Sequence, residues 1–258
     1  MALIKTPEEI IKLKAGGQLL SQALKAAVEA VRPGVKISKL NAIAEKVIID
    51  GGGRPSFKGF KTSPEDTPFP STVCISVNEE IVHGLGNRDR QLKAGDIVGL
   101  DVGCWYQDLC TDMSVTVPVG PIAPEVRRLL DVTKQALLEG VAAAKVGATI
   151  ADISAAIQAP ADQQGYGIIR SLSGHGVGHA VHEAPAVPNF TDPSQPNIEI
   201  KDGMILALEP MFALGDYRVR TGDDGWAVIM ADDSLSAHFE VTIACLKNGP
   251  EIITPLPV

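Results

Sequence analysis

The sequence predicts an α+β fold in which two similar halves pack around one core. In each half the helices come first and hairpin-forming strands follow, which is the order typical of α+β proteins, and motifs of the first half recur in the second. Among the 258 residues, 45% are hydrophobic and 21% are charged, as expected of a globular chain. Because no Ser/Gly-rich linker separates the halves, we expect a single domain over residues 1–258.

Two helices open the chain. Thr6 is a suitable N-cap for the first helix, with Pro7 at its first position and Glu9 completing a capping box. Apolar residues then recur at helical spacing until Arg32-Pro33-Gly34. A second helix is predicted from about Ser38 to Asp50, where three glycines follow.

The same plan returns near residue 123, which indicates an internal duplication with halves of approximately 1–120 and 121–258. Coincidence in a sequence rich in alanine and glycine is the alternative explanation. The recurring motifs are Gln22-Ala23-Leu24 with Gln135-Ala136-Leu137, Gly34 with Gly147, Ile37 with Ile150, Lys93-x-Gly95 with Lys201-x-Gly203, and His83-Gly84-Leu85-Gly86 with His175-Gly176-Val177-Gly178.

Two aspartates stand out in the strands of the first half. Asp101 interrupts the apolar strand Ile97 to Val102, where an unpaired carboxylate would be costly to bury. A tight turn around Tyr106-Gln107 would place Asp112 directly opposite Asp101, with their Cβ atoms about 5 Å apart. Two carboxylates at that distance repel each other unless they share a proton or hold a cation between them.

The second half repeats this pattern. Glu209 follows the apolar run Met204–Leu208, and Glu240 lies on the opposite face from Val241, Ile243 and Cys245. His175 stands between two glycines, which leaves room beside its imidazole. A single such residue would be explained more simply as exposed or salt-bridged. Four carboxylates and an imidazole on equivalent strands instead predict a site for one or two Mn, Fe, Co or Zn ions of the kind that two-metal hydrolases use.

The overall charge and the cysteines exclude other classes of protein. The net charge is −8, which argues against non-specific binding to nucleic acid. Cys74, Cys104, Cys110 and Cys245 fit no zinc or redox spacing, so we expect free and mostly buried thiols. There is no run of about 18 apolar residues and no apolar core for a secretion signal, so we expect a cytoplasmic protein with no membrane span.

The remaining histidines have simpler explanations when each is considered alone. His83 and His182 could be hydrogen-bonded structural histidines. His179 and His238 are expected to be partly exposed residues without a role.

With these residues in place, the chain resembles the type I methionine aminopeptidases of the pita-bread fold, in which two pseudo-symmetric αβ halves surround a central antiparallel sheet. The resemblance covers nearly the whole chain. The metal pattern is shared with prolidases, whereas the Cys-Ile-Ser-x-Asn-Glu stretch before His83 is specific to methionine aminopeptidases. The matching segments are Val73 to Gly84, Gly174 to Gly178, His182-Glu183-x-Pro185, Leu208 to Met211, and Phe239-Glu240-x-Thr242.

The resemblance implies a role for each of these residues. Asp101, Asp112, His175, Glu209 and Glu240 would hold two divalent cations (Fe(II), Mn, Co or Zn), with Asp112 and Glu240 bridging them. A hydroxide that bridges the cations would attack the carbonyl of the N-terminal methionine, with Glu209 as proton shuttle. His83 and His182 would hydrogen-bond the scissile peptide, which overrides their simpler explanation. Cys74, Phe60, Phe69 and Trp226 would line the methionine pocket, and Phe57 is a weaker candidate.

The chain departs from the family pattern at three places. The segment Lys58 to Pro70 is longer than usual, Val241 replaces a frequent histidine, and the turn near Tyr106-Gln107-Asp108 lacks Asp-Gly. None of these positions is an expected ligand, but the longer segment leaves the shape of the pocket rim, and so the range of substrates, open.

The resemblance therefore implies an enzyme that removes N-terminal methionine from nascent proteins and peptides, with a small uncharged second residue preferred. It also implies a monomer, and it raises docking on the ribosome as a hypothesis. Two alternatives are an Xaa-Pro aminopeptidase or prolidase, and a non-catalytic pita-bread protein that uses its cleft for binding. Prolidases usually carry a large N-terminal domain that we do not expect here, and a binding protein would be expected to have lost metal ligands.

Overall fold

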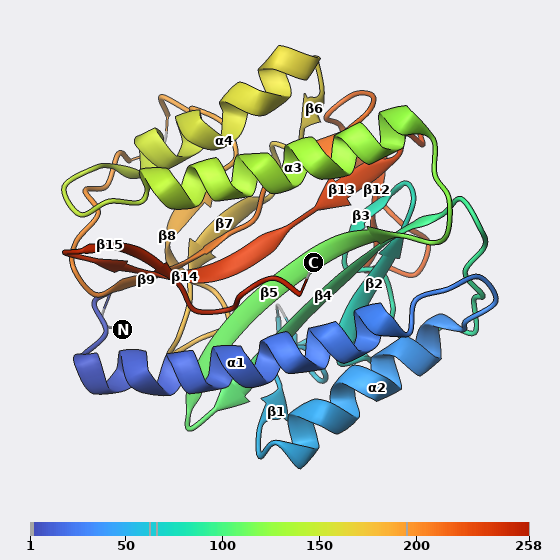
Figure 1. Cartoon of the computed structure of the whole chain (residues 1–258), viewed down its shortest axis with the longest axis horizontal. Helices are drawn as coiled ribbons and strands as arrows, with labels where there is room; N and C mark the ends of the chain where they lie inside the picture. Colours follow the sequence, from blue (N-terminus) through green and yellow to red (C-terminus); the bar gives the residue numbers. More distant parts are fainter. Residues whose placement is uncertain (1–2, 62, 66, 195, 258) are drawn as a thin grey trace.

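Four helices cover one side of a curved antiparallel sheet in the residues that the structure, a computed structural model, describes: 3–61, 63–65, 67–194 and 196–257 (Figure 1). Helices α1 and α2 lie over the strands of the first half, and α3 and α4 lie over those of the second. The helices are α1 (Pro7–Glu29), α2 (Ile37–Asp50), α3 (Pro124–Ala143) and α4 (Ile150–Gln164).

The main sheet has nine strands in the order β1-β4-β5-β14-β9-β7-β8, with β2 also paired to β4 and β15 also paired to β14. Two smaller sheets, β13-β10-β6 and β11-β12-β3, flank it. The strands are β1 (Arg54–Pro55), β2 (Val73–Val77), β3 (Glu80–Val82), β4 (Ile97–Tyr106), β5 (Leu109–Pro118), β6 (Gly167–Ile168), β7 (Ser173–Gly176), β8 (Glu183–Pro188), β9 (Met204–Leu208), β10 (Met211–Ala213), β11 (Val219–Thr221), β12 (Val228–Met230), β13 (Ser236–His238), β14 (Glu240–Leu246) and β15 (Gly249–Ile252).

The predicted start of the first helix is confirmed. The hydroxyl of Thr6 accepts a hydrogen bond from the main-chain N–H of Glu9, and the Glu9 carboxylate accepts one from the N–H of Thr6. This reciprocal pair satisfies two N–H groups that a helix leaves unbonded at its N-terminus. The second predicted helix is also present, and it begins one residue early, at Ile37.

Corresponding points of the two halves have the same local geometry. Gly34 and Gly147, which precede α2 and α4, both adopt left-handed φ angles, 84° and 89°. Their N–H groups donate to the carbonyls of Leu92 and Ile200 at 2.7 and 2.9 Å. These pairs fit the predicted duplication, while the boundary near residue 120 and the single-domain organisation stay predictions.

Strand alternation separates the core from the site. In β4 and β5, Leu100, Val102, Met113 and Val115 belong to the core that packs beneath the helices, so the alternate residues Asp101 and Asp112 point to the other face. The predicted apolar face of β14 is confirmed by the same core, which contains Val241, Ile243 and Cys245.

The predicted state of the cysteines is also confirmed, since all four are free and buried. Among the described residues, no helix is both long enough and apolar enough to span a membrane.

Candidate active site

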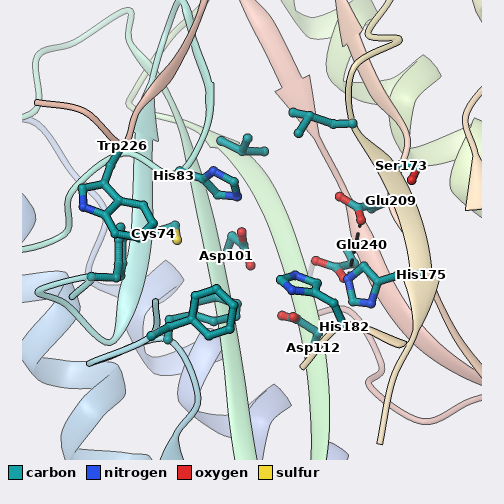
Figure 2. Close-up of a pocket in the computed structure, with 15 residues that line it drawn as sticks. Cys74, His83, Asp101, Asp112, Ser173, His175, His182, Glu209, Trp226 and Glu240 are labelled. Atoms are coloured by element: carbon teal, nitrogen blue, oxygen red, sulfur yellow. Dashed lines mark ion pairs between the residues drawn. The ribbon is translucent and has the colours of Figure 1, made fainter. Parts of the chain in front are cut away.

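One cavity of about 250 Å³ brings together every residue predicted for the site (Figure 2). It lies on the face of the sheet away from the helices and has two chemically different ends. Trp226 and Cys74 lie at one end, and a group of acidic residues and histidines lies at the other, with His83 and Asp101 between them; that group is Asp112, His175, His182, Glu209 and Glu240. The predicted residues that line it are Phe57, Phe60, Phe69, Cys74, His83, Asp101, Asp112, His175, His182, Glu209, Trp226 and Glu240, and it also contacts Val82, Leu172 and Ser173.

The two aspartates face the cavity from adjacent strands, but they are not directly opposite. Asp101 pairs with Ser114, and Asp112 pairs with Gly103. The prediction of direct opposition is wrong because the turn is centred one residue later, on Gln107 and Asp108, which both have positive φ angles. This moves the register by two residues, and an even shift keeps both side chains on the same face.

Three ligand-type residues come from the second half. Glu240 begins β14, Glu209 directly follows β9, and His175 lies on β7 opposite Ala207. The Nδ1 atom of His175 is 3.0 Å from the carbonyl oxygen of Gly176, so Nδ1 carries the hydrogen and Nε2 presents a lone pair to the cavity. Asp112, His175 and Glu240 each place a ligand atom within 4.8 Å of the other two.

The charges at this end of the cavity require compensation. Burial raises the pKa of Asp101 to about 7. Burial, followed by repulsion from neighbouring carboxylates, raises the pKa values of Asp112, Glu209 and Glu240 well above their usual range. Asp101 Oδ1 and Glu240 Oε1 are buried without a hydrogen-bond partner in the described part of the chain. None of the described residues lining the cavity is Lys or Arg, so a divalent cation fits this donor set.

His83 and His182 approach the cavity from two sides. His83 follows β3 with a positive φ of 59°, and burial together with the charge of His182 lowers its pKa to about 4. His182 as a whole residue is exposed, but its ring lies edge-on between Phe60, at 5.6 Å, and His175, at 4.5 Å. This enclosure lowers its pKa as well. Both rings are therefore neutral at pH 7, when a histidine can both donate and accept a hydrogen bond.

The other end of the cavity is apolar. The rings of Phe69 and Trp226 pack edge to face with centroids 5.2 Å apart. Cys74, on β2 opposite Asp101, is buried. Burial and the nearby carboxylates raise the pKa of its thiol, so it remains uncharged and behaves as a small apolar wall.

The long segment between Lys58 and Pro70 is closed at its base by the pocket residues themselves. The N–H of Phe69 donates to the carbonyl of Phe60 at 2.9 Å, and the N–H of Gly59 donates to the carbonyl of Phe69 at 2.8 Å. These bonds hold both rings at the cavity. Thr62 and Asp66, which the sequence singled out within this segment, lie outside the described residues.

The expectation for His238 is wrong. The residue is only 2% exposed, and its Nε2 lies 3.6 Å from Glu209 Oε2 and 3.9 Å from Glu240 Oε2. The sequence did carry a signal for this position, because His238 and Glu240 are two residues apart and point to the same side of an extended chain. His179 is half-buried, as expected, and its Nε2 is 2.6 Å from a carboxylate oxygen of Glu9.

Comparison with known proteins places the chain in a family. Residues 11–245 match the metallopeptidase family M24. The chain belongs to this family. Within M24, methionine aminopeptidases match over nearly their whole length: that of Clostridium perfringens is 41% identical over 98% of this chain and 99% of its own, and methionine aminopeptidase 1 of Bacillus subtilis is 37% identical over 98% and 99%.

Solved M24 structures agree with this assignment. The methionine aminopeptidase of Thermotoga maritima superposes with a TM-score of 0.92 at 37% identity, covering 97% of this chain and 98% of its own. The prolidase of Pyrococcus furiosus shares the fold, with a TM-score of 0.77, but it is 24% identical and only 65% of its length is covered. The predicted membership of the methionine aminopeptidases and the pita-bread fold are thus confirmed, and the prolidase alternative is not favoured.

Proposed function

We propose that this M24 protein removes the N-terminal methionine from nascent proteins and peptides by metal-dependent hydrolysis, with a preference for a small uncharged second residue. The observation that carries the proposal is the single cavity with an acidic end beside an apolar, aromatic end. If Phe69, Trp226 and Cys74 hold the apolar side chain of the substrate's first residue, the main-chain carbonyl of that residue would face the acidic end. A thioether suits this wall, because sulfur packs favourably against aromatic rings.

Five residues would hold two divalent cations at the acidic end. Asp112 and Glu240 would be shared by the two cations, His175 and Glu209 would complete one site, and Asp101 would complete the other. Fe(II), Mn, Co and Zn all suit this set of oxygen and nitrogen donors. Such cations supply a Lewis acid that polarises the scissile carbonyl and stabilises the charge developing on its oxygen.

The protein's own groups orient the substrate and move the proton. A carboxylate oxygen of Glu209 takes the proton of the attacking water and passes it to the departing amine nitrogen. Glu209 suits this role because burial and the charge of Asp101 raise its pKa. The neutral rings of His83 and His182 would hydrogen-bond the scissile peptide and fix it beside the carboxylates.

The experiment that tests this function measures release of methionine from Met-Ala-Ser. Metal-free protein would be assayed with Mn, Fe(II), Co and Zn added separately, beside a Glu209→Ala variant and an Xaa-Pro peptide. We expect metal-dependent release that the variant loses by a factor of about 10²–10⁴, as is typical when a proton-transferring group is removed. Cleavage of Xaa-Pro but not Met-Ala-Ser would favour a prolidase, and folded protein with no activity on either peptide would favour a binding role.

The cellular setting is proposed from the same function. An enzyme that acts on nascent chains would work in the cytoplasm as a monomer and would meet its substrates at the ribosome. Co-sedimentation with ribosomes at low salt tests this association, and absence of binding there would contradict it.

A further inference from the structure

His238 is a buried histidine, and one of its two ring nitrogens, Nε2, lacks a hydrogen-bond partner in the described part of the chain. It ends β13 and is 2% exposed. Leaving a buried polar group unpaired destabilises the fold, and such groups are rare in native proteins. We therefore expect a neighbouring residue to become the hydrogen-bond partner of Nε2 when cations occupy the site.

The nearest polar atoms are carboxylate oxygens of two proposed metal ligands. His238 Nε2 is 3.6 Å from Glu209 Oε2 and 3.9 Å from Glu240 Oε2, both beyond hydrogen-bond distance. The other oxygen of Glu209, Oε1, is 3.6 Å from His175 Nε2. The carboxylate of Glu209 thus lies between two imidazoles, with one facing each oxygen.

The backbone holds His238 firmly in this place. A single hydroxyl, Thr116 Oγ1, accepts the N–H of His238 at 3.0 Å and donates to its carbonyl at 2.8 Å. On the other side, Asn189 Nδ2 donates to the main-chain carbonyl of Glu209 at 3.0 Å. Both the imidazole and the carboxylate are fixed through their main chains, so a small side-chain adjustment is enough to join them.

The two imidazoles have different surroundings. Among the described residues, His175 offers a ring nitrogen to the group of ligand atoms within 4.8 Å of one another, together with atoms of Asp112 and Glu240, and His238 is not in that group. A ligand carboxylate is normally held by an outer hydrogen-bond donor that fixes which oxygen meets the metal.

We infer that His238 is a positioning residue whose Nε2–H donates to Glu209 Oε2 and leaves Oε1 for the cation beside His175. The inference rests on the proposed function, since it assigns Glu209 to a metal site. A neutral imidazole can carry its hydrogen at Nε2, so no change of protonation is needed.

The test compares His238→Gln, which keeps an N–H donor, with His238→Leu, which fills similar space without one. Binding of Mn(II) to the metal-free proteins is measured by calorimetry, and kcat and KM are measured on Met-Ala-Ser. We expect His238→Leu to lose about 10–100-fold in Mn(II) affinity, with a matching loss in kcat and little change in KM. His238→Gln should stay close to the wild type, and the visible spectrum of its Co(II) form should be unchanged.

Three results would overturn the inference. If His238→Leu binds Mn(II) with the affinity of the wild type, His238 has only a packing role. Equal losses in both variants, or an altered Co(II) spectrum in His238→Gln, would make the imidazole a ligand itself.

Thermal denaturation of the metal-free proteins checks folding, and His238→Met replaces the leucine variant if that variant does not fold. If the wild type binds Mn(II) but does not cleave Met-Ala-Ser, the proposed function fails while the calorimetric comparison still tests His238.

Discussion

At the scale of single residues, Trp226 shows what the apolar end of the cavity contributes. Its ring packs edge-on against Phe69 and forms one wall of the space proposed for the methionine side chain. The loop bearing it is held by Asp224, whose carboxylate accepts the N–H groups of Trp226 and Ala227 at 2.9 and 2.8 Å. The wall is therefore fixed before a substrate arrives.

We expect Trp226→Ala to raise KM for Met-Ala-Ser by roughly 10- to 100-fold and to leave kcat largely unchanged. An apolar contact to the side chain is made equally in the bound substrate and in the transition state, so its loss weakens binding and not the chemical step. Steady-state kinetics on the metal-loaded enzyme measure this. A fall in kcat with an unchanged KM would instead place Trp226 near the reacting atoms.

The individual site residues were largely predictable from the sequence, but their mutual geometry was not. Asp101 and Glu209 stood out because each is a carboxylate placed against an apolar strand. His238 was missed although it shares one side of the extended chain with Glu240, because the sequence does not show that Glu209, which follows β9, lies against its imidazole. A contact between residues on different strands depends on packing and leaves no local pattern.

At the scale of elements, the N-terminal segment fastens the loop that carries His182. Lys5 and Glu183 form a buried ion pair at 2.6 Å, with side chains only 1% and 5% exposed. Glu183 Oε1 also accepts the main-chain N–H groups of His179 and Ala180. The residues from 177 to 182 have no regular secondary structure, so these contacts hold His182 at the cavity.

We expect Lys5→Met to lower the free energy of unfolding by about 3 kcal/mol, because it leaves the Glu183 carboxylate buried without its cation. Urea denaturation of the metal-free protein measures the change. Adding Glu183→Gln should restore much of it, since the amide oxygen still accepts both N–H groups. Lys46→Met is the matched control: its ion pair with Asp50 is 74% and 61% exposed, and its loss should cost less than about 1 kcal/mol. Similar losses in both single variants would contradict the argument.

The hairpin of β4 and β5 shows how an element can be predicted while its register is missed. Both strands were evident, but the turn was placed one residue early because Gln107 and Asp108 are not typical of a turn that needs two positive φ angles. The prediction that both aspartates face one site still held, because side chains alternate between the two faces of a strand. A two-residue slip left Asp101 and Asp112 facing the same cavity.

At the scale of the whole molecule, the site exists only where the two halves meet. Asp101 and Asp112 come from β4 and β5, whereas His175, Glu209 and Glu240 come from or directly follow β7, β9 and β14. Their carboxylates are buried together, so the folded protein holds repulsion that cations would remove. This cost should appear in the stability of the entire chain.

We expect the melting temperature of metal-free protein to fall as the pH rises from about 6.5 to 8.5. The folded-state pKa of Asp101 is raised to about 7, and those of Asp112, Glu209 and Glu240 are raised well above normal. In this range the folded state therefore binds more protons than the unfolded state, in which these carboxyls are already ionised. Each such group lowers stability by up to about 1.4 kcal/mol per pH unit.

The histidines set the lower limit of this window. Burial lowers the pKa values of His83 and His175 to about 4 and that of His238 to about 3. Below about pH 6.5 the unfolded histidines take up protons that the folded ones do not, so stability falls with falling pH and opposes the carboxyl effect. Between about pH 7 and 8 the carboxyls dominate, because the four buried thiols, whose pKa values burial also raises, lower stability only as the pH nears the usual thiol pKa of about 8.5. Calorimetric scans in EDTA at pH 6.5, 7.5 and 8.5, repeated with excess Mn(II), should show a downward slope that the cation removes, because it binds the ionised carboxylates of the folded state. A melting temperature independent of pH in EDTA, or the same slope with Mn(II), would mean that these carboxylates do not share a cation site.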